Sequence, residues 1–298
     1  MLDLKEVTIG DRAWVIDLMR RSIFRGSEYN FANLYNWSTT YTVRIGRFED
    51  FFIVQSGETS LRFLYPAGSG DVTRAIDAIE EHVRAKGQPL RMYGVNPEAR
   101  AVLEQCYPGR FIFTPVRDNF DYIYERESLA TLKGKKLHGK RNHIARFLDA
   151  NPDWRYEQLG KENFKEVWEM NAEWCRRNQC DKSVSLQREA CAARSGLEHF
   201  DELELTGGVL RVGGNVIAFT YGSPVTDDTF DVHVEKAFSD IQGAYPMINQ
   251  QFVLRELEGY RYVNREDDVG DEGLRRAKES YQPAFLYQRF SVAERDNP

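Results

Sequence analysis

The order of apolar and polar residues in the first 65 positions predicts a helix followed by three antiparallel strands. Trp14, Leu18 and Ile23 have helical spacing, and Thr8 stands where its side chain can cap that helix. Aromatic and β-branched residues are then concentrated at 41–45, 51–55 and 61–65, which indicates three short strands. We therefore expect the chain to begin with a helix and a strand meander.

Helices and strands alternate over the next 60 residues. Asp71 can cap a helix whose core face has apolar residues at helical spacing, namely Val72, Ile76, Ile79 and Val83. The remaining segments read as a strand at 90–95, a short helix at 97–106, and strands at 111–116 and 119–125. This order indicates an α/β domain.

The second half repeats helices followed by strands. Asn163 opens a helix with Glu166 at the capping-box position, and a second helix is expected at 186–199. Strands at 209–212 and 216–221 would form a hairpin through Gly213-Gly214-Asn215, a turn that tolerates positive φ.

Residues 229–236 alternate strictly, so apolar and polar side chains should point to opposite faces of one strand. The polar set is Asp231, His233 and Glu235, and the apolar set is Phe230, Val232 and Val234. A loop of mostly small residues follows and leads into a helix expected from Pro246. Because a helix N-terminus offers free amides to an anion, this loop is a candidate phosphate site; its residues are Gln242, Gly243, Ala244 and Tyr245.

A strand is expected at 260–263, and an acidic loop around Gly270 follows it. The loop contains five carboxylates, Glu266, Asp267, Asp268, Asp271 and Glu272. A short helix with Leu274, Lys278 and Tyr281 on one face should follow, and then a strand at 285–292. The loop can be a functional site or a solvated acidic turn at a helix N-terminus. For Asp268 and Glu272, solvation is the favoured interpretation.

Composition narrows the class of protein. The 298 residues are 42% hydrophobic and 29% charged, which suits a folded globular chain with one large or two ordinary domains. A net charge of −6 excludes a global basic field. No stretch is apolar enough for a transmembrane segment, and the N-terminus lacks a signal-peptide layout, so we expect a cytoplasmic protein. The four cysteines and five histidines form no metal-binding motif, so no metal site is expected.

One segment, 133–147, concentrates positive charge. It has six basic residues and no acid: Lys133, Lys135, Lys136, Lys140, Arg141 and Arg146. Such a segment suits the phosphates of a tRNA acceptor end, of coenzyme A or of a phospholipid head group. The alternative is a solvated helix that balances acids elsewhere. Asn151-Pro152-Asp153 then breaks the chain.

Residues 264–283, NREDDVGDEGLRRAKESYQP, resemble the C-terminal signature of the phosphatidylglycerol lysyltransferase C-terminal domain family, and more closely its soluble relatives. Further matching segments are SEYNFANLYNW (27–37), GKKLHGKRNHIARF (134–147) and HVEKAFSDIQGAYPMINQQF (233–252). That family is part of the GNAT-like acyltransferases, which include Fem-type aminoacyltransferases. The resemblance covers the chain nearly end to end.

The resemblance implies an α/β fold of tandem GNAT-like domains with mixed sheets and flanking helices. The implied division is an N-terminal domain at 1–130, a basic connecting helix at 131–153 and a C-terminal domain at 154–298. In GNAT enzymes the strand before the anion loop lines the catalytic cleft, and the loop holds pyrophosphate. Here QGAYP, with bulky Tyr245, departs from the usual glycine-rich pattern. This departure favours an aminoacyl-tRNA donor over coenzyme A.

Acyl transfer requires a base for the attacking group and a donor for the leaving group. Candidate bases are Glu235, His233, Asp231, Glu266 and Asp267, and candidate proton donors are Tyr281 and Lys278. The donor substrate would contact Lys136, Lys140, Arg141 and Lys278 together with the small-residue loop. No Ser-His-Asp or Cys-His order stands out, so direct transfer is favoured over a covalent intermediate. Alternatively, Glu235 and His233 are part of an ion-paired strand face.

Three functions follow as hypotheses. The first is an acyl- or aminoacyltransferase that uses aminoacyl-tRNA and an amine or hydroxyl acceptor, which could be a small molecule, a peptide or a lipid. The second is a coenzyme A-dependent N-acyltransferase. The third is a non-catalytic module that binds a nucleotide or RNA. The basic segment and the resemblance favour the first.

Overall fold

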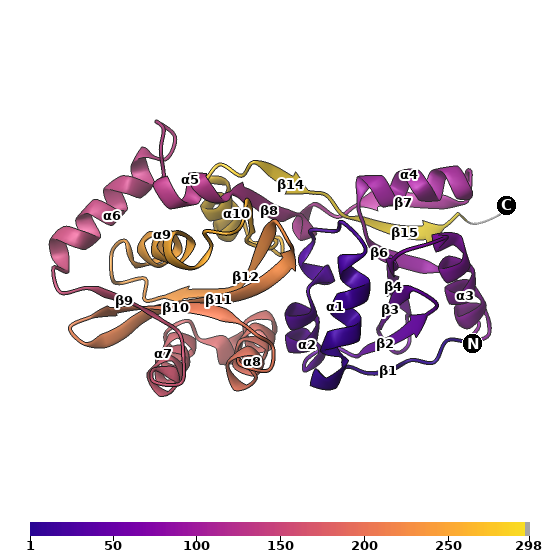
Figure 1. The fold of residues 1–298 in the computed structure, drawn as a ribbon, viewed down its shortest axis with the longest axis horizontal. Coiled ribbons are helices and arrows are strands. Elements are labelled where there is room, and N and C mark those ends of the chain that lie inside the picture. Colours follow the sequence, from indigo (N-terminus) through magenta and orange to yellow (C-terminus); the bar gives the residue numbers. More distant parts are fainter. Residues whose placement is uncertain (296–298) are drawn as a thin grey trace. The chain divides into compact units, whose positions relative to one another are not determined.

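Strand pairing divides the chain into two sheets. A computed structural model describes residues 1–295. Its first compact unit comprises Met1–Asp121, Asp267–Gly270 and the chain from Leu286 on, and its second comprises Tyr122–Glu266 and Asp271–Phe285. Each unit has its own sheet with helices packed on it (Figure 1).

The sheet of the first unit is mixed. Its strands lie in the order β1 (Lys5–Glu6), β2 (Val43–Phe48), β3 (Phe51–Ser56), β4 (Arg62–Leu64), β6 (Arg91–Val95), β15 (Phe290–Glu294) and β7 (Phe111–Pro115), with β5 (Ala67–Gly68) beside β3. Its helices are α1 (Arg12–Arg20), α2 (Phe31–Ser38), α3 (Val72–Arg84) and α4 (Pro97–Cys106). Ile76 and Ile79 of α3 are fully buried against Ile53 and Phe63 of the sheet, as the helical spacing predicts.

The sheet of the second unit has the order β14 (Phe285–Tyr287), β8 (Asp121–Glu125), β13 (Tyr262–Asn264), β12 (Thr229–Ala237), β11 (Asn215–Thr226), β10 (Thr206–Val212) and β9 (Arg155–Gln158). Its helices are α5 (Arg126–Thr131), α6 (His138–Ala150), α7 (Phe164–Arg177), α8 (Val184–Glu198), α9 (Ala244–Glu256) and α10 (Glu272–Glu279). In this unit α9 covers one face of the sheet, and α7 and α8 cover the other (Figure 1).

The units are not the contiguous segments that the sequence predicts. Strand β8 already belongs to the second sheet, and β15 returns to the first sheet, antiparallel to both β6 and β7. The strand expected at 285–292 is therefore two strands in different sheets. Residues Gln288 and Arg289 separate them, and the Arg289 side chain is buried.

Several local expectations need correction. Helix α9 begins at Ala244, not at Pro246, because Gly243 has a left-handed conformation and serves as its N-cap. Ile23 lies beyond the end of α1 and is 78% exposed. The Asn163–Glu166 capping box does not form, since Glu166 pairs with Arg211 of β10 instead. The predicted meander, α3 and the β10–β11 hairpin are confirmed.

Candidate functional site

Strands β12 and β13 pair side by side over only three residues before they separate. Their parallel register runs from Thr229–Tyr262 to Asp231–Asn264. Beyond it, two ion pairs link the separating segments: His233 Nδ1 lies 3.1 Å from Glu266 Oε1, and Arg265 Nη2 lies 2.8 Å from Glu235 Oε1. Four residues that the sequence places on two separate segments are thus brought together in pairs.

His233 occupies a β-bulge, which breaks the expected alternation of β12. On β11, Gly222 pairs with Val232 and the adjacent Tyr221 pairs with Val234, so the register skips His233. A bulge of this kind redirects the side chains on either side of it.

The contacts of β12 confirm the change of face. Phe230 packs on Phe252 of α9, and Asn249 of α9 donates a hydrogen bond to Glu235 Oε2 at 2.7 Å. Phe230 and Glu235 therefore both face α9, although the sequence predicts opposite faces for them. The prediction of one polar face with Asp231, His233 and Glu235 is wrong, because an extra residue reverses the alternation.

Three polar side chains surround the His233 imidazole. Ser223 Oγ lies 2.9 Å from Nε2, whereas Glu266 Oε1 and Asp231 Oδ2 lie 3.1 and 3.5 Å from Nδ1. An ionised carboxylate can only accept a hydrogen bond, so the Nδ1–H donates to Glu266 and Nε2 of a neutral ring is left to accept from the Ser223 hydroxyl. This is the tautomer that a general base needs.

The same cluster could hold a metal ion. Ligand atoms of Asp231, His233 and Glu266 all lie within 4.8 Å of one another. Imidazole and carboxylate groups are common protein ligands of divalent metal ions. Asp231 and His233 are both on β12, whereas Glu266 follows β13, so no local sequence spacing could reveal the set. The expectation of no metal site stays a prediction.

The backbone of Glu266 is held in an uncommon conformation. Its φ is 55°, and its N–H donates to Asn264 Oδ1 at 2.7 Å. A non-glycine residue in this region costs about 1 kcal/mol or more, and such outliers are concentrated at functional sites. Asn264 is fully buried and fixes the turn that directs Glu266 toward His233.

On the α9 face, the Arg265 guanidinium is surrounded by an acid and aromatic rings. It lies 4.7 Å from the centroid of the Tyr281 ring, and Lys140 Nζ lies 3.9 Å from the same centroid. Burial, and then the Arg265 charge, lower the pKa of Lys140 to about 8. Burial raises the pKa of Tyr281 well above its usual range, so its hydroxyl stays protonated near neutral pH.

The predicted donor-site residue Lys278 has a backbone partner. Its ammonium donates to the carbonyl of Arg265 at 2.6 Å, and the Tyr124 hydroxyl donates to the carbonyl of Lys278 at 2.7 Å. Lys278 thus links α10 to the segment that carries Arg265 and Glu266.

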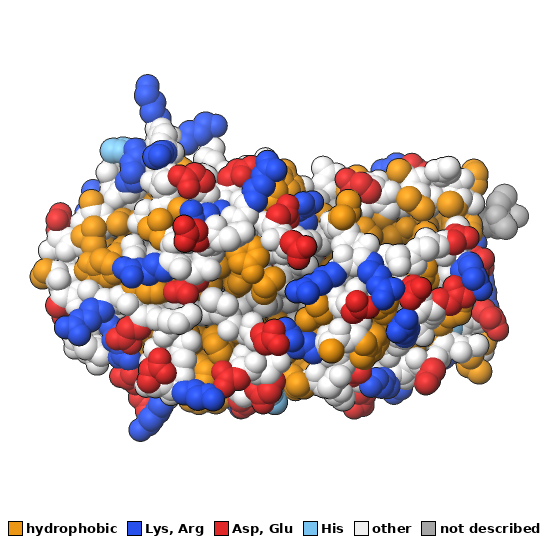
Figure 2. Space-filling view, viewed as in Figure 1, with side chains coloured by type: hydrophobic (Ala, Val, Ile, Leu, Met, Phe, Trp, Pro, Cys, Tyr) orange, Lys and Arg blue, Asp and Glu red, His pale blue; other side chains and the backbone are white. Residues whose placement is uncertain are grey.

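The basic segment is split between exposed and structural residues. Lys133, Lys135 and Lys136 are exposed in the connection between α5 and α6, where basic side chains project in Figure 2. Arg141 instead donates to the carbonyls of Leu132 and Gly134, the latter at 2.9 Å. Arg141 therefore holds the connection in shape, while the lysines face solvent.

The small-residue loop packs against α6. A Cβ added at Gly243, where φ is 85°, would lie 2.4 Å from the His143 carbonyl oxygen and 2.9 Å from Phe147 Cβ. Tyr245 Oη accepts a hydrogen bond from Trp174 Nε1 at 3.2 Å, Ala244 is buried and Gln242 is exposed. Close packing alone accounts for glycine at position 243, so the role of the loop in binding an anion stays a prediction.

The carboxylates of the acidic loop differ in their exposure and in their hydrogen-bond partners. Asp268 is fully buried and accepts a hydrogen bond from Arg117 Nη1 at 3.2 Å, so the expectation of a solvated side chain is wrong. Asp271 caps α10 by accepting from the Leu274 amide at 2.7 Å, as a carboxylate at a helix N-terminus can. Glu272 is exposed, as expected.

The first unit contains a buried charge cluster that the sequence does not indicate. Arg289 Nη2 lies 2.9 Å from Glu28 Oε2 and also contacts Asp121, whose Oδ2 accepts from the Ser27 amide at 2.8 Å. Burial raises the pKa of Glu28 to about 7, against the attraction of Arg289 and with the help of the Asp121 and Asp267 charges. The aromatic segment around Glu28 is core, since Tyr29 and Phe31 are buried.

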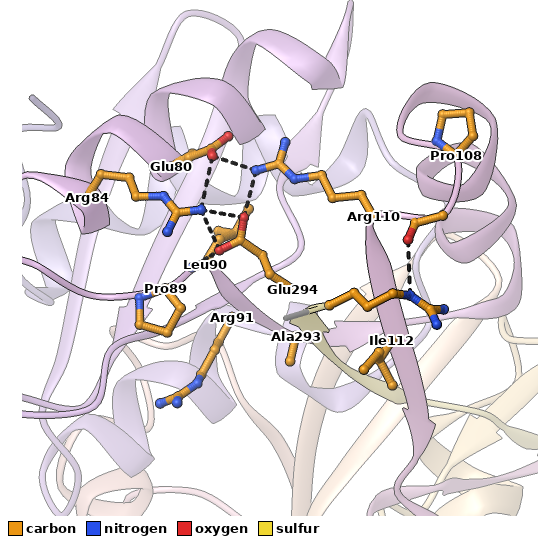
Figure 3. A pocket seen from close by; sticks show the side chains of 12 residues that line it. Glu80, Arg84, Pro89, Leu90, Arg91, Pro108, Arg110, Ile112, Ala293 and Glu294 are labelled. Atoms are coloured by element: carbon orange, nitrogen blue, oxygen red, sulfur yellow. Dashed lines mark hydrogen bonds and ion pairs between the residues drawn. The ribbon is translucent and has the colours of Figure 1, made fainter. Parts of the chain in front are cut away.

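A large cavity of the first unit lacks the predicted site residues. It has a volume of about 920 Å³ and is lined by Glu80, Arg84, Arg110 and Glu294, among others (Figure 3). Arg84 and Arg110 approach Glu294 to 2.6 and 2.9 Å, so acids already balance these arginines. We therefore favour the place where β12 and β13 separate, with His233 and Glu266, as the candidate site.

Comparison with known proteins identifies a family. Residues 19–293 match the family model described as phosphatidylglycerol lysyltransferase, C-terminal. A protein of unknown function from Bacteroides thetaiotaomicron is 40% identical, with a TM-score of 0.95 over 99% of this chain and 100% of its own. The chain spans 55% of the length of the curated protein it matches, an uncharacterized protein from Mycoplasmoides gallisepticum that is 22% identical over 178 residues.

Two more distant structures establish the fold. The C-terminal domain of a putative lysylphosphatidylglycerol synthetase from Agrobacterium fabrum is 16% identical and has a TM-score of 0.68, with 97% of this chain and 92% of that one covered. A tandem GNAT protein from the clavulanic acid biosynthesis pathway is 11% identical and has a TM-score of 0.50 over the full length of both. The predicted tandem GNAT-like α/β fold is confirmed. Within residues 1–295, no helix combines the length and apolarity that crossing a bilayer requires.

Proposed function

The chain belongs to the phosphatidylglycerol lysyltransferase C-terminal domain family, and we propose that it transfers an acyl or aminoacyl group from aminoacyl-tRNA to an amine or hydroxyl acceptor. The known members of the family and fold are related to acyltransferases. The particular donor, the acceptor class and a cytoplasmic location are parts of this proposal.

One observation carries the proposal: His233 lies between a hydroxyl and a carboxylate where β12 and β13 separate. With Nδ1–H donated to Glu266, Nε2 can remove a proton from an attacking group. A base positioned in this way contributes about 10²–10⁴-fold to the rate of proton transfer-dependent steps. The Glu266 carboxylate orients the ring and balances the positive charge that the ring acquires.

The residues on the α9 face support this base. The Glu235–Arg265 ion pair joins β12 to the segment after β13, and Lys278 holds the Arg265 carbonyl. Since Arg265 and Glu266 are consecutive and contact opposite faces, fixing the first also fixes the second. Glu235, Tyr281 and Lys278 thus position the base, while Lys140 adds positive charge beside them.

The exposed lysines before α6 would contact the tRNA backbone. Lys133, Lys135 and Lys136 lie close together in sequence and project into solvent, so each can approach a phosphate. Arg141 is not part of this proposed tRNA contact, because its guanidinium already donates to backbone carbonyls of the connection.

The test is binding of aminoacyl-tRNA to a triple variant, K133E/K135E/K136E, at several salt concentrations. The matched control reverses three exposed basic residues elsewhere, Arg20, Lys165 and Lys182, and so changes the net charge equally. We expect the wild-type affinity to fall steeply with salt. Each phosphate contact adds roughly 0.7–0.9 to the slope of log affinity against log salt concentration, so the loss of three contacts should reduce that slope by about 2–3 in the triple variant and leave it unchanged in the control.

Three results would redirect the proposal. Equal losses in both triple variants would make the attraction a general charge effect. Saturable binding of acetyl-coenzyme A with no tRNA affinity would favour the coenzyme A-dependent enzyme. Binding of tRNA without transfer of its aminoacyl group to any amine acceptor, in a preparation with intact His233, would favour a non-catalytic RNA-binding module.

A further inference from the structure

We propose that Ser223 is a nucleophile that carries the acyl group as a serine ester between donor and acceptor. The inference rests on the proposed acyl transfer and on His233 as its base. It replaces the direct transfer that the sequence favours, because the fold assembles a serine, a histidine and an acid that the chain order conceals.

The three groups have the mutual geometry of an activated serine. Ser223 Oγ lies 2.9 Å from His233 Nε2, and His233 Nδ1 lies 3.1 Å from Glu266 Oε1. A nucleophile within hydrogen-bond distance of a base, itself oriented by a third group, is the diagnostic arrangement for nucleophilic catalysis. Ser223 is on β11, His233 on the adjacent β12, and Glu266 on the segment after β13.

Irregularities in the sheet explain how these side chains meet. The β11–β12 register shifts on both sides of Ser223, at Tyr221–Gly222 and at Pro224–Thr226. The first shift is the bulge that redirects His233. Bulges are over-represented next to active sites, where they redirect a side chain.

A neighbouring hydroxyl on the same strand offers a contrast. Thr220 is fully buried, and its Oγ1 donates to the Val234 carbonyl at 2.8 Å, which satisfies its proton within the sheet. The Ser223 hydroxyl instead lies 2.9 Å from the imidazole Nε2, and the residue as a whole is 5% exposed. The His233 imidazole is therefore placed to accept the proton of the Ser223 hydroxyl.

The chemical step conserves atoms and charge. Ser223 Oγ attacks the donor carbonyl as His233 Nε2 accepts the hydroxyl proton, and a C–O bond forms. Collapse of the tetrahedral intermediate breaks the donor ester bond, and His233 returns the proton to the departing tRNA 3′ oxygen. The acceptor amine then attacks the serine ester, passes its proton through His233 to Ser223 Oγ, and leaves with the acyl group.

Two carboxylates face the charged form of the ring during this step. Glu266 Oε1 accepts from Nδ1, and Asp231 Oδ2 lies 3.5 Å from the same nitrogen on a fully buried side chain. Negative charge at that position stabilises the imidazolium that forms when Ser223 loses its proton.

The experiment uses the full chain and a small fluorophosphonate probe, which labels activated serines without need of the natural substrates. Intact mass and peptide mapping should find one phosphonyl group on Ser223. S223A should take up none, H233N should label at least 100-fold more slowly, and S185A, at an exposed serine, should label like the wild type. Circular dichroism of each variant confirms that it is folded.

A second arm uses aminoacyl-tRNA with a radiolabelled amino acid. The proposal predicts a labelled wild-type protein that releases the amino acid to hydroxylamine, which cleaves esters. Transfer at the wild-type rate by S223A would overturn the nucleophile and leave direct transfer in place. Labelling of Ser223 by the probe without any reaction with tRNA would instead overturn the proposed donor and keep the nucleophile.

A metal site is the remaining outcome. Zn²⁺ could bind stoichiometrically, require Asp231, His233 and Glu266, and abolish probe labelling. That result would mean that His233 Nδ1 is a metal ligand. The nucleophile would then be overturned, because the ring could not hold the proton arrangement that activates Ser223.

Discussion

Replacing Glu28 with glutamine should flatten the dependence of folding stability on pH. Glu28 shares Arg289 with Asp121, so two acids compete for one buried cation. Burial raises the pKa of Glu28 from 4.5 to about 7. Glutamine keeps the shape of the side chain and cannot ionise, while Arg289 keeps its contact with Asp121.

The sign follows from the raised pKa. The folded state binds the Glu28 proton more tightly than the unfolded state, so this proton stabilises the fold fully below pH 4.5. That contribution is lost as pH rises through 7. A shift of about 2.5 pKa units, from 4.5 to about 7, corresponds to an upper limit of about 3 kcal/mol at 1.36 kcal/mol per unit. We expect the free energy of unfolding to depend on pH by about 1–3 kcal/mol less in Glu28→Gln.

The assay is urea denaturation of both proteins at pH 5 and pH 8, with Glu98→Gln as a control at an exposed carboxylate. The difference between the two pH values should shrink in Glu28→Gln and be unchanged in the control. Comparing differences removes the contribution of other titrating groups. An identical pH dependence in all three proteins would refute the account of this cluster.

Two further changes test packing and charge in the second unit. Gly243→Ala should lower the free energy of unfolding by about 2–4 kcal/mol in thermal or urea unfolding, because it combines positive φ with overlap of the His143 carbonyl, whereas Gly259→Ala, where an added Cβ meets open space, should change it little. Arg265→Leu should cost about 3–5 kcal/mol by the same measurement, since it leaves the Glu235 charge unpaired. Adding Glu235→Leu should recover part of that loss, and a double variant no more stable than Arg265→Leu would contradict the pairing.

Local patterns in the sequence predict most of the secondary structure. The meander depends on short-range alternation and α3 on helical spacing, and neither needs information from distant residues. The β10–β11 hairpin follows from a glycine-rich turn between two apolar runs. Resemblance to the family supplies the tandem arrangement, which local patterns alone do not contain.

The departures arise where distant segments decide the outcome. The return of β15 to the first sheet depends on the burial of Arg289 beside Glu28 and Asp121, partners remote in the sequence. The bulge at His233 depends on the register with β11, and a strictly alternating sequence conceals it. Alternation predicts faces only when pairing is continuous.

The same reason explains which site residues the sequence reveals. It identifies His233 and Glu266 as candidates from their chemistry, and the structure brings them together. It misses Ser223, because a serine near the end of a strand is common and only the register across β11 and β12 sets it beside the imidazole. A hairpin register predicted from the sequence would be the signal with which to find it.

The rate of acyl transfer by two variants tests the central claim, which is that the base lies at His233 and not across the sheet at Glu235. Both His233→Asn and Glu235→Gln preserve approximate shape, and folding of each is checked by urea denaturation. With aminoacyl-tRNA and an amine acceptor, we predict that His233→Asn transfers about 10²–10⁴-fold more slowly, while Glu235→Gln stays within an order of magnitude of the wild type. An inactive Glu235→Gln beside a fully active His233→Asn would contradict the account and assign the base to the α9 face.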